Sequence, residues 1–521
     1  MRLSFHRPVP GRRLAPLASL CAALILAVAP AVGHAAPPQT APPAPQNVNV
    51  RIPSTEPELS QWIADQWGRI PIEIRGLDRA KMQELQIIVD GIVVAGRHHL
   101  KNFPESAHRT EAITALVQSL SLNRERFRAK MNRDLKSFVD DAAERRLMVI
   151  DELRVYVQDL LKLTEEGLAG NPTPTQRARL HITRGDSFQH WNDHAKAAAE
   201  YRMTVDADPT GPLAARATFA LIGELLDLRA FDEMREQAVV LMSHWPEKCR
   251  LAELTWLLHL ANRYRGDLEQ GRRLWDSMRP MLRAGARGEA IPLTKGALPE
   301  RVRHTWEDYY GRSFFYRGFY TFARGEYEAA STHFAAFLDH YDGLAEQGIT
   351  PPQSLGVYRQ FQAVPYMTSL TALIGKPAPA LGIGEQFGGG HASVVLLCSA
   401  QNARGAQRTF IPFLTKLANE DPEDPVRLHW VSSPGRIDES DPTRSTVAKM
   451  AELDQVAAEL GYQGMRGLDP EAEIHRSYFL NPGTANMYVL DRKGNVIWHL
   501  IYPTTNDEGL VRRVFERARA K

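Results

Sequence analysis

Cysteine is scarce in this chain: its 521 residues include only three. Cys21 lies in an apolar N-terminal segment, so a product cut after that segment would keep only Cys249 and Cys398. Two cysteines cannot form the several disulfide bonds that hold small secreted domains together, and that class of scaffold is excluded. An excess of one charge is also absent, because 63 Lys and Arg stand against 61 Asp and Glu. This balance indicates no nucleic-acid partner, since phosphate binding needs a basic excess or stripe.

Long apolar runs are absent after the first 35 residues. Those residues contain four arginines, then an apolar run from 14 to 32, and Gly33 and Ala35 supply the small residues three and one positions before a cut after Ala35. The pattern predicts a signal peptide over 1–35, so we expect an exported protein, periplasmic or secreted, with no membrane span after cleavage. The alternative is an uncleaved anchor, because the apolar run approaches the length that spans a bilayer.

The length predicts two or three domains, because one hydrophobic core rarely serves so long a chain. A proline-rich stretch, APPQTAPPAPQ, should form a stiff linker, and helical periodicity follows it. We therefore divide the chain after the signal peptide into a linker (36–52), a helical domain (53–172), helical repeats (173–345), a second linker or partial helix packing (346–372) and an α/β domain (373–521).

Four short segments with one shared pattern indicate repeats within 173–345. They occupy residues 191–197, 228–234, 265–271 and 324–330, so the first three recur every 37 residues and the fourth follows after 59. Such a period is typical of stacked helical hairpins. The segments resemble the inter-helix turn of the tetratricopeptide repeat. At the positions where that repeat has small residues, this sequence has Gly185, Ala197, Gly318 and Ala330. At the position where the repeat has a bulky ring, it has Tyr201, Trp275 and Phe334. A plain helical bundle is the alternative.

Strand patterns appear only after residue 373. Apolar, β-branched runs occupy 393–398, 426–432, 487–490 and 496–501. Helical patterns separate or follow them at 407–418, 447–460 and 508–520. Strands that alternate with helices predict an α/β sheet, and the short turn at 491–494 adds an antiparallel pair at its end.

Five ordered landmarks in this domain resemble one family. They are Gly375–Pro379 before the first strand, the strand residues 394–399, the pair Ile411-Pro412, the segment 468–478 and the strand and turn 487–494. In this order they resemble the thioredoxin-like superfamily, most closely exported TlpA-like thiol-disulfide reductases and their redoxin relatives. The resemblance implies a multidomain chain: an all-α, tetratricopeptide-like N-terminal region followed by an α/β thioredoxin-like domain.

The residues on which that family's chemistry depends are missing. Alignment on Ile411-Pro412 places the two motif cysteines at Arg404 and Gln407, and the cis-proline at Ala485. The chemistry needs a thiolate at a helix N-terminus and a second thiol one turn later. Arginine and glutamine supply neither, and Arg404 at a helix N-terminus would be unfavourable beside the helix dipole. The resemblance therefore implies a degenerate active site, with no cofactor or metal.

Cys398 is the one thiol near this position. It follows an apolar strand, where burial raises the pKa of a thiol and lowers its reactivity, so a structural role is favoured over catalysis. A disulfide between Cys249 and Cys398 would join the helical region to the α/β domain, but two distant cysteines rarely meet the required geometry.

Histidines and glycines provide the remaining candidates. His98, His99 and His108 form one group, and His190 with His194 has the spacing of metal ligands, but we interpret both groups as surface histidines. The run Gly388–Gly390 precedes a strand rather than a helix, which indicates a flexible turn rather than a phosphate site.

Two hypotheses follow from these residues. The first is an exported interaction or scaffold protein that binds an unknown protein or peptide through its repeats and a redox-inactive thioredoxin-like domain. The second is a thioredoxin-like oxidoreductase or antioxidant enzyme that uses an unrecognised thiol, for which Cys398 is the weak candidate. The missing motif thiols favour a protein that is not an enzyme. The sequence identifies neither the partner nor the oligomeric state.

Overall fold

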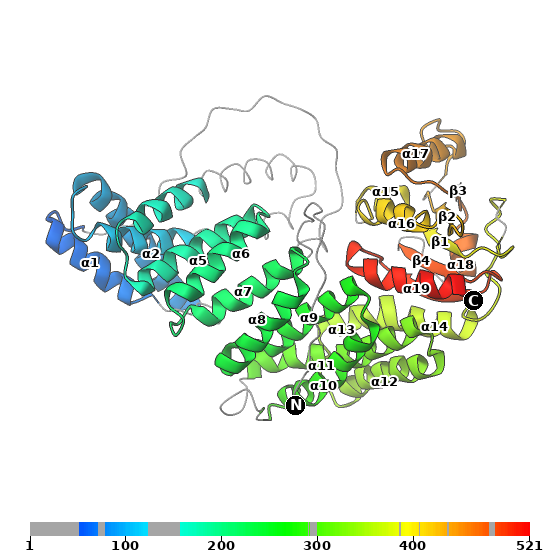
Figure 1. Cartoon of the computed structure of the whole chain (residues 1–521), viewed down its shortest axis with the longest axis horizontal. Coiled ribbons are helices and arrows are strands. Elements are labelled where there is room, and N and C mark those ends of the chain that lie inside the picture. Colours follow the sequence, from blue (N-terminus) through cyan, green and yellow to red (C-terminus); the bar gives the residue numbers. More distant parts are fainter. Residues whose placement is uncertain are drawn as a thin grey trace. The chain divides into compact units, whose positions relative to one another are not determined.

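A computed structural model describes residues 52–70, 79–122, 157–289, 291, 300–384, 387–405, 407–434, 437–478 and 485–520 (Figure 1). The predicted signal peptide and residues 36–51 of the first linker lie outside the described residues. The chain divides between Cys249 and Arg250 into two compact units, and each is described by itself. This division falls inside the region 173–345 that carries the repeat pattern.

The first unit is helical throughout its described residues, as the periodicity predicted. Two helices without bounding labels span residues 109–122 and 157–169. The labelled helices are α1 (Glu56–Gly68), α2 (Arg79–Asn102), α5 (Pro174–His190), α6 (His194–Ala207), α7 (Ala214–Asp227), α8 (Phe231–His244) and the short η2 (Pro246–Lys248).

Local sequence determines where the first hairpin begins and turns. Thr173 caps α5 through its side chain, which accepts a hydrogen bond from the backbone N–H of Gln176, and Pro174 occupies the first helical position. Asp193 caps α6 in the same way, accepting from Lys196 N. A Cβ added to Gly185 would lie 2.7 Å from the Tyr201 ring, so only glycine allows α5 and α6 to approach this closely.

The second unit begins with six helices and one π-helical turn. They are α9 (Leu251–Arg265), α10 (Leu268–Ala286), α11 (Glu300–Arg324), α12 (Tyr327–Glu346), α13 (Gln353–Tyr358), the π-helical turn η3 (Arg359–Ala363) and α14 (Val364–Ala372). The segment 346–372 is therefore largely helical. Within it Tyr366 is buried and stacks on Phe334 of α12, with ring centroids 5.3 Å apart.

A five-stranded mixed sheet completes the second unit. Its strands are β1 (Ser393–Leu397), β2 (Arg427–Ser432), β3 (Met465–Leu468), β4 (Asn486–Leu490) and β5 (Val496–Ile501). They lie in the order β3-β2-β1-β4-β5, where β1, β2 and β3 are parallel and β4 is antiparallel to both neighbours. The four predicted strands match β1, β2, β4 and β5 to within one residue. The sequence analysis missed β3, because its four residues, MRGL, contain no apolar alternation.

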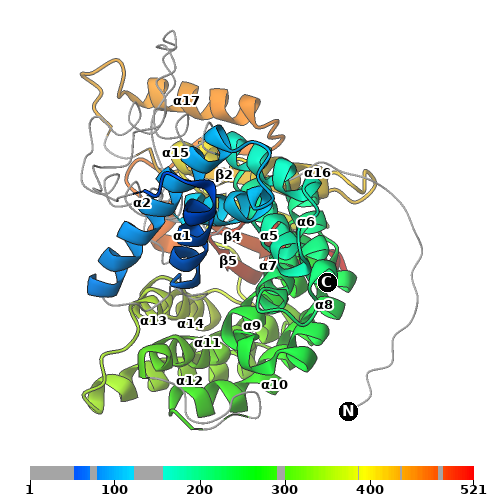
Figure 2. The same cartoon turned by 90° about the vertical axis from the view of Figure 1, so that its left-hand side faces the viewer.

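Helices pack around this sheet within the second unit. They are α15 (Ala400–Arg404), α16 (Phe410–Ala418), α17 (Thr446–Glu459), α18 (Glu473–Ser477), the short η4 (Thr505–Asp507) and α19 (Glu508–Ala520). Every residue of β1, β4 and β5 is buried, as expected of strands covered on both faces. In both views helices α11–α14 form a layer below the strands, and α17 lies above the strands, on the side away from that layer (Figures 1 and 2).

The α/β domain is bonded directly to the helical layer of its own unit. Gly509 at the start of α19 lies against Gly266 at the end of α9, where an added Cβ would come within 2.3 Å of backbone atoms. Close by, the guanidinium of Arg263 forms an ion pair with the fully buried carboxylate of Asp507. The two parts of the second unit are thus one packed body. Among the described residues, no helix has the length and apolar character needed to cross a membrane.

Candidate functional site

The residues aligned with the redox motif lie after β1, but not as predicted. Ser399 caps α15 by accepting from the backbone N–H of Asn402, so this helix begins at Ala400 and ends at Arg404. The expectation that Arg404 lies at a helix N-terminus is therefore wrong: it lies at a C-terminal end, where a positive charge is favourable. The next helix, α16, begins at Phe410, three residues later than predicted.

Arg404 is bound by acidic residues of α17. Its Nε lies 3.3 Å from Glu459 Oε2, and one terminal nitrogen lies 3.9 Å from Glu452 Oε1. These side chains are substantially exposed, so solvent screens the contact and it contributes little to stability. Arg404 is thus a cation that joins α15 to α17.

The other two aligned positions are buried. Gln407 is almost fully buried; its backbone N–H donates to Asn402 O at 3.0 Å, and its side-chain Oε1 has no hydrogen-bond partner among the described residues. Ala485 is also buried, and its carbonyl accepts from Tyr502 N at 2.8 Å. Neither described side chain is available to a substrate in solution.

Cys398 lies at the end of β1 with 0% of its surface exposed. Burial raises the pKa of its thiol far above the ordinary value, so the reactive thiolate is not formed at neutral pH. Its carbonyl accepts from Trp430 Nε1 at 2.7 Å, which ties the strand end to β2. Cys249 is 2% exposed, and neither of these two cysteines forms a disulfide.

The histidine groups are only partly on the surface. His98 and His108 are exposed, but His99 and His194 are buried, so the surface interpretation is wrong for these two. His99 Nε2 lies 3.0 Å from Ser60 Oγ of α1, which explains its burial as a polar contact between α1 and α2.

His190 and His194 do not share a helix. His190 ends α5, while His194 begins α6. His194 instead faces α7, where its Nδ1 lies 2.8 Å from Glu224 Oε2 and 3.5 Å from Asp227 Oδ2. Among the described residues these three are the group that could hold a metal ion. The sequence analysis missed both carboxylates because they lie 30 or more residues away, although their i, i+3 spacing places them on one helix face.

The glycine run before β1 forms a turn. Gly388, Gly389 and Gly390 all have positive φ, between 64° and 85°, a conformation that favours glycine. A bridge joins Gly388 to His391 across this turn.

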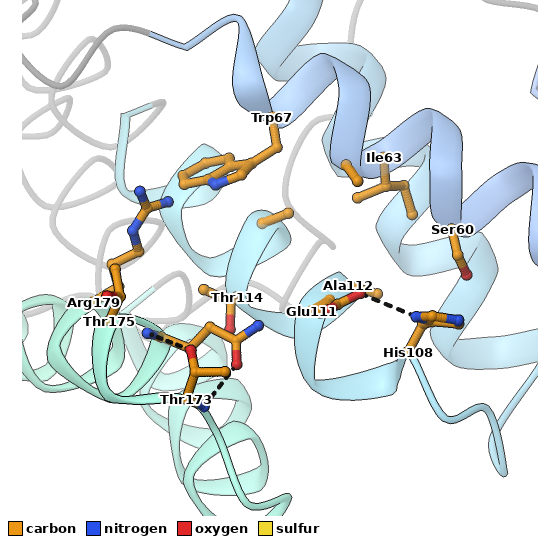
Figure 3. A pocket seen from close by; sticks show the side chains of 13 residues that line it. Ser60, Ile63, Trp67, His108, Glu111, Ala112, Thr114, Thr173, Thr175 and Arg179 are labelled. Atoms are coloured by element: carbon orange, nitrogen blue, oxygen red, sulfur yellow. Dashed lines mark hydrogen bonds and ion pairs between the residues drawn. The ribbon is translucent and has the colours of Figure 1, made fainter.

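A recess opens in the first unit between α1, the helix 109–122 and the start of α5 (Figure 3). Its volume is about 290 Å³. The ring of Trp67 lies over the guanidinium of Arg179, 4.8 Å from ring centroid to Cζ, while Ile63 and Ala112 add apolar surface. Arg179 combines a charge with a partly buried, aromatic environment, and burial lowers the pKa of its guanidinium.

A second, basic recess lies between α10 and α11 in the second unit, with a volume of about 630 Å³. Its charged lining residues are Arg279, Arg283, Arg287, Arg317, Asp276 and Glu289. Arg317 Nε lies 2.5 Å from Asp276, and Arg287 lies 3.9 Å from Glu289.

Two arginines of this basic recess have no carboxylate partner among the described residues. Arg279 stacks on the Phe314 ring, with Cζ 3.9 Å from the centroid, and Arg283 forms no ion pair there. The recess therefore has an excess of positive charge beside the apolar surfaces of Pro280 and Tyr310. Such a surface attracts anionic groups.

No protein-family model matches this chain, and no curated protein matches it significantly.

Proposed function

We propose that this chain is an exported interaction protein, with tetratricopeptide-like helical hairpins and a thioredoxin-like domain that has no redox activity. The strand order around β1, with β2 parallel on one side and the antiparallel pair β4-β5 on the other, supports the thioredoxin-like assignment. The glycine–ring contacts of Gly185 with Tyr201 and Gly318 with Phe334 support the repeat assignment, since both occur at the small-residue positions of that pattern.

The burial of both remaining thiols is the observation that carries the proposal. A thiol oxidoreductase needs an accessible thiolate, and the sequence after residue 35 contains only Cys249 and Cys398. Both are buried, and the motif positions hold a salt-bridged arginine and a buried glutamine. The fold can therefore serve for recognition but has no group for disulfide exchange.

The basic recess of α10 and α11 is the binding site that we propose. Arg279 and Arg283 would bind the carboxylates of an acidic peptide segment, while Pro280, Ala284 and Tyr310 would contact its apolar side chains. The partner is thus a protein with an exposed segment that alternates acidic and apolar residues. Its binding should weaken as salt rises, because surface charges are screened.

A labelled peptide that alternates glutamate and leucine tests this site by fluorescence anisotropy. We expect the double substitution Arg279→Gln and Arg283→Gln to weaken binding by about tenfold, since each solvent-accessible ion pair contributes up to about 1 kcal/mol. Arg273→Gln is the matched control, because this arginine lies on the same helix, is largely exposed and is not part of the recess. Equal weakening by the control would contradict the assignment of the site.

An insulin-reduction assay tests the absence of redox activity. We expect no turnover above the rate without protein. Turnover that disappears in the Cys398→Ser variant would overturn the proposal in favour of an oxidoreductase.

A further inference from the structure

A group of one imidazole and two carboxylates, of which His194 and Glu224 are buried and Asp227 is partly exposed, lies between α6 and α7. His194 is the first residue of α6, and Asp227 is the last residue of α7. Glu224 precedes Asp227 by three residues, so both carboxylates project from one face of α7 toward the imidazole. The three facing atoms, His194 Nδ1 and one oxygen of each carboxylate, all lie within 4.8 Å of one another.

The distances are close to those of a metal coordination sphere. Nδ1 lies 2.8 Å from Glu224 Oε2 and 3.5 Å from Asp227 Oδ2. Ligands held about 2.0–2.2 Å from a tetrahedral zinc ion lie roughly 3.3–3.5 Å apart, so small side-chain movements would complete the sphere. Nitrogen and carboxylate oxygen without thiolate is a ligand set that suits zinc and neighbouring divalent transition metals.

A neighbouring amide orients the first carboxylate. Gln189 Nε2 donates a hydrogen bond to Glu224 Oε1, the oxygen that does not face His194. The other oxygen, Oε2, is therefore left to face the imidazole. In metal sites, hydrogen bonds from neighbouring residues orient the ligating carboxylates in the same way. The other ring nitrogen, His194 Nε2, is buried without a hydrogen-bond partner among the described residues. Without a metal ion, Nδ1 is the ring nitrogen that donates to Glu224 Oε2, because a carboxylate only accepts. A bound cation would replace that proton on Nδ1, as metal binding to histidine releases a proton.

The charges of the group favour a divalent cation. The side chains of His194 and Glu224 are 4% and 1% exposed, and that of Asp227 is 30% exposed. A neutral imidazole with two carboxylates has charge −2, which one divalent ion balances.

We propose that His194, Glu224 and Asp227 bind one divalent transition-metal ion of the zinc class. The ion would cross-link the first turn of α6 to the last turn of α7, and so join two consecutive helical hairpins. The partly exposed side of Asp227 would leave one coordination position to water. This inference does not depend on the proposed binding of acidic peptides.

Titration of the metal-free full chain, lacking only residues 1–35, tests the site. The protein is first dialysed against EDTA to remove bound metal. Co²⁺ is then added, and the visible absorption of cobalt bound by nitrogen and oxygen ligands in a low-symmetry site is followed. Zn²⁺ binding is measured separately by calorimetry. We expect one ion per chain and a higher melting temperature with Zn²⁺, because an ion that binds only the folded state stabilises it. Absence of stoichiometric binding would overturn the proposal.

Three variants locate the ion. Glu224→Gln retains the size and a hydrogen-bonding oxygen but removes the charge, and we expect it to weaken Zn²⁺ binding at least tenfold. Asp227→Asn, at the exposed edge of the group, should weaken binding similarly and keeps the test decisive if Glu224→Gln fails to fold. Glu233→Gln on α8 is the control, since its side chain is solvent-accessible and pairs with Arg202. If both site variants bind Zn²⁺ as tightly as the control does, the ion is elsewhere and the proposal is wrong.

Discussion

His499 in β5 provides the sharpest test of how the two parts of the second unit are joined. Its ring is fully buried and stacks on Tyr488, with centroids 4.2 Å apart. Ser369 Oγ of α14 lies 2.8 Å from Nδ1, and Asn486 Oδ1 of β4 lies 2.9 Å from Nε2. An amide oxygen only accepts, so Nε2 carries the proton and donates it to Asn486, while Nδ1 accepts from Ser369. The contacts therefore suit a neutral imidazole.

Burial lowers the pKa of His499 from 6.5 to about 3. Between these two values the unfolded chain binds a proton that the folded chain does not bind. The contribution of His499 to stability is therefore complete above pH 6.5 and is lost as the pH falls from 6.5 toward 3. Each pH unit corresponds to about 1.4 kcal/mol, so at pH 4.5 the folded state should be destabilised by about 2.7 kcal/mol through this one residue.

Hydrogen exchange of the β4–β5 peptides measures this loss in the intact chain. The protection free energy is compared between the wild type and His499→Gln at pH 7.5 and at pH 4.5. Because the wild type and the variant are compared at the same pH, the effects of pH on intrinsic exchange and on all other titrating groups cancel. We expect the loss of protection free energy caused by His499→Gln to be about 2–3 kcal/mol smaller at pH 4.5 than at pH 7.5. His304→Gln is the control, because this histidine of α11 is exposed. If the cost of His499→Gln is the same at both pH values, the ring is not buried as described.

Further predictions concern packing and thiols. Gly509→Ala should destabilise the second unit by about 1–3 kcal/mol in thermal or urea unfolding, because its Cβ would meet the backbone of Gly266; an unchanged midpoint would mean that α9 and α19 are not in contact. A thiol reagent should label neither Cys249 nor Cys398 in the native protein and both in denaturant, and native labelling would contradict their burial. Arg404→Ala should leave the midpoint of urea unfolding nearly unchanged, and a clear shift to lower urea would show that its ion pairs are not solvent-screened.

Periodicity in the sequence was sufficient to predict the two kinds of structure and where they change. Apolar residues at three- and four-residue intervals predicted helices up to residue 345, and β-branched runs predicted β1, β2, β4 and β5. The segment 346–372, predicted as a linker or partial helix packing, is largely helical. Both patterns are local, since a helix or a strand buries one face according to its own repeat. The structure places Gly185 directly against the ring of Tyr201, where close packing of α5 on α6 leaves no room for a larger residue.

The surroundings of the site residues depend on contacts between segments that are distant in the sequence, so local patterns predicted them less well. The sequence located Arg404 and Gln407 after β1, but whether a helix begins or ends at Arg404 depends on the cap supplied by Ser399. The burial of His194 beside Glu224 follows from the packing of α6 on α7, and no local pattern encodes it.

The sequence by itself determined that only two cysteines, Cys249 and Cys398, follow residue 35, since that is a matter of residue identity. It also determined the order of helical and α/β segments, which local periodicity specifies. Only the tertiary structure decided that Cys398 has no access to solvent, that His499 is held neutral between α14 and β4, and that the α/β domain packs on the helical layer of its own unit. Burial and pKa depend on neighbours brought together by folding, and those neighbours are far apart in the chain.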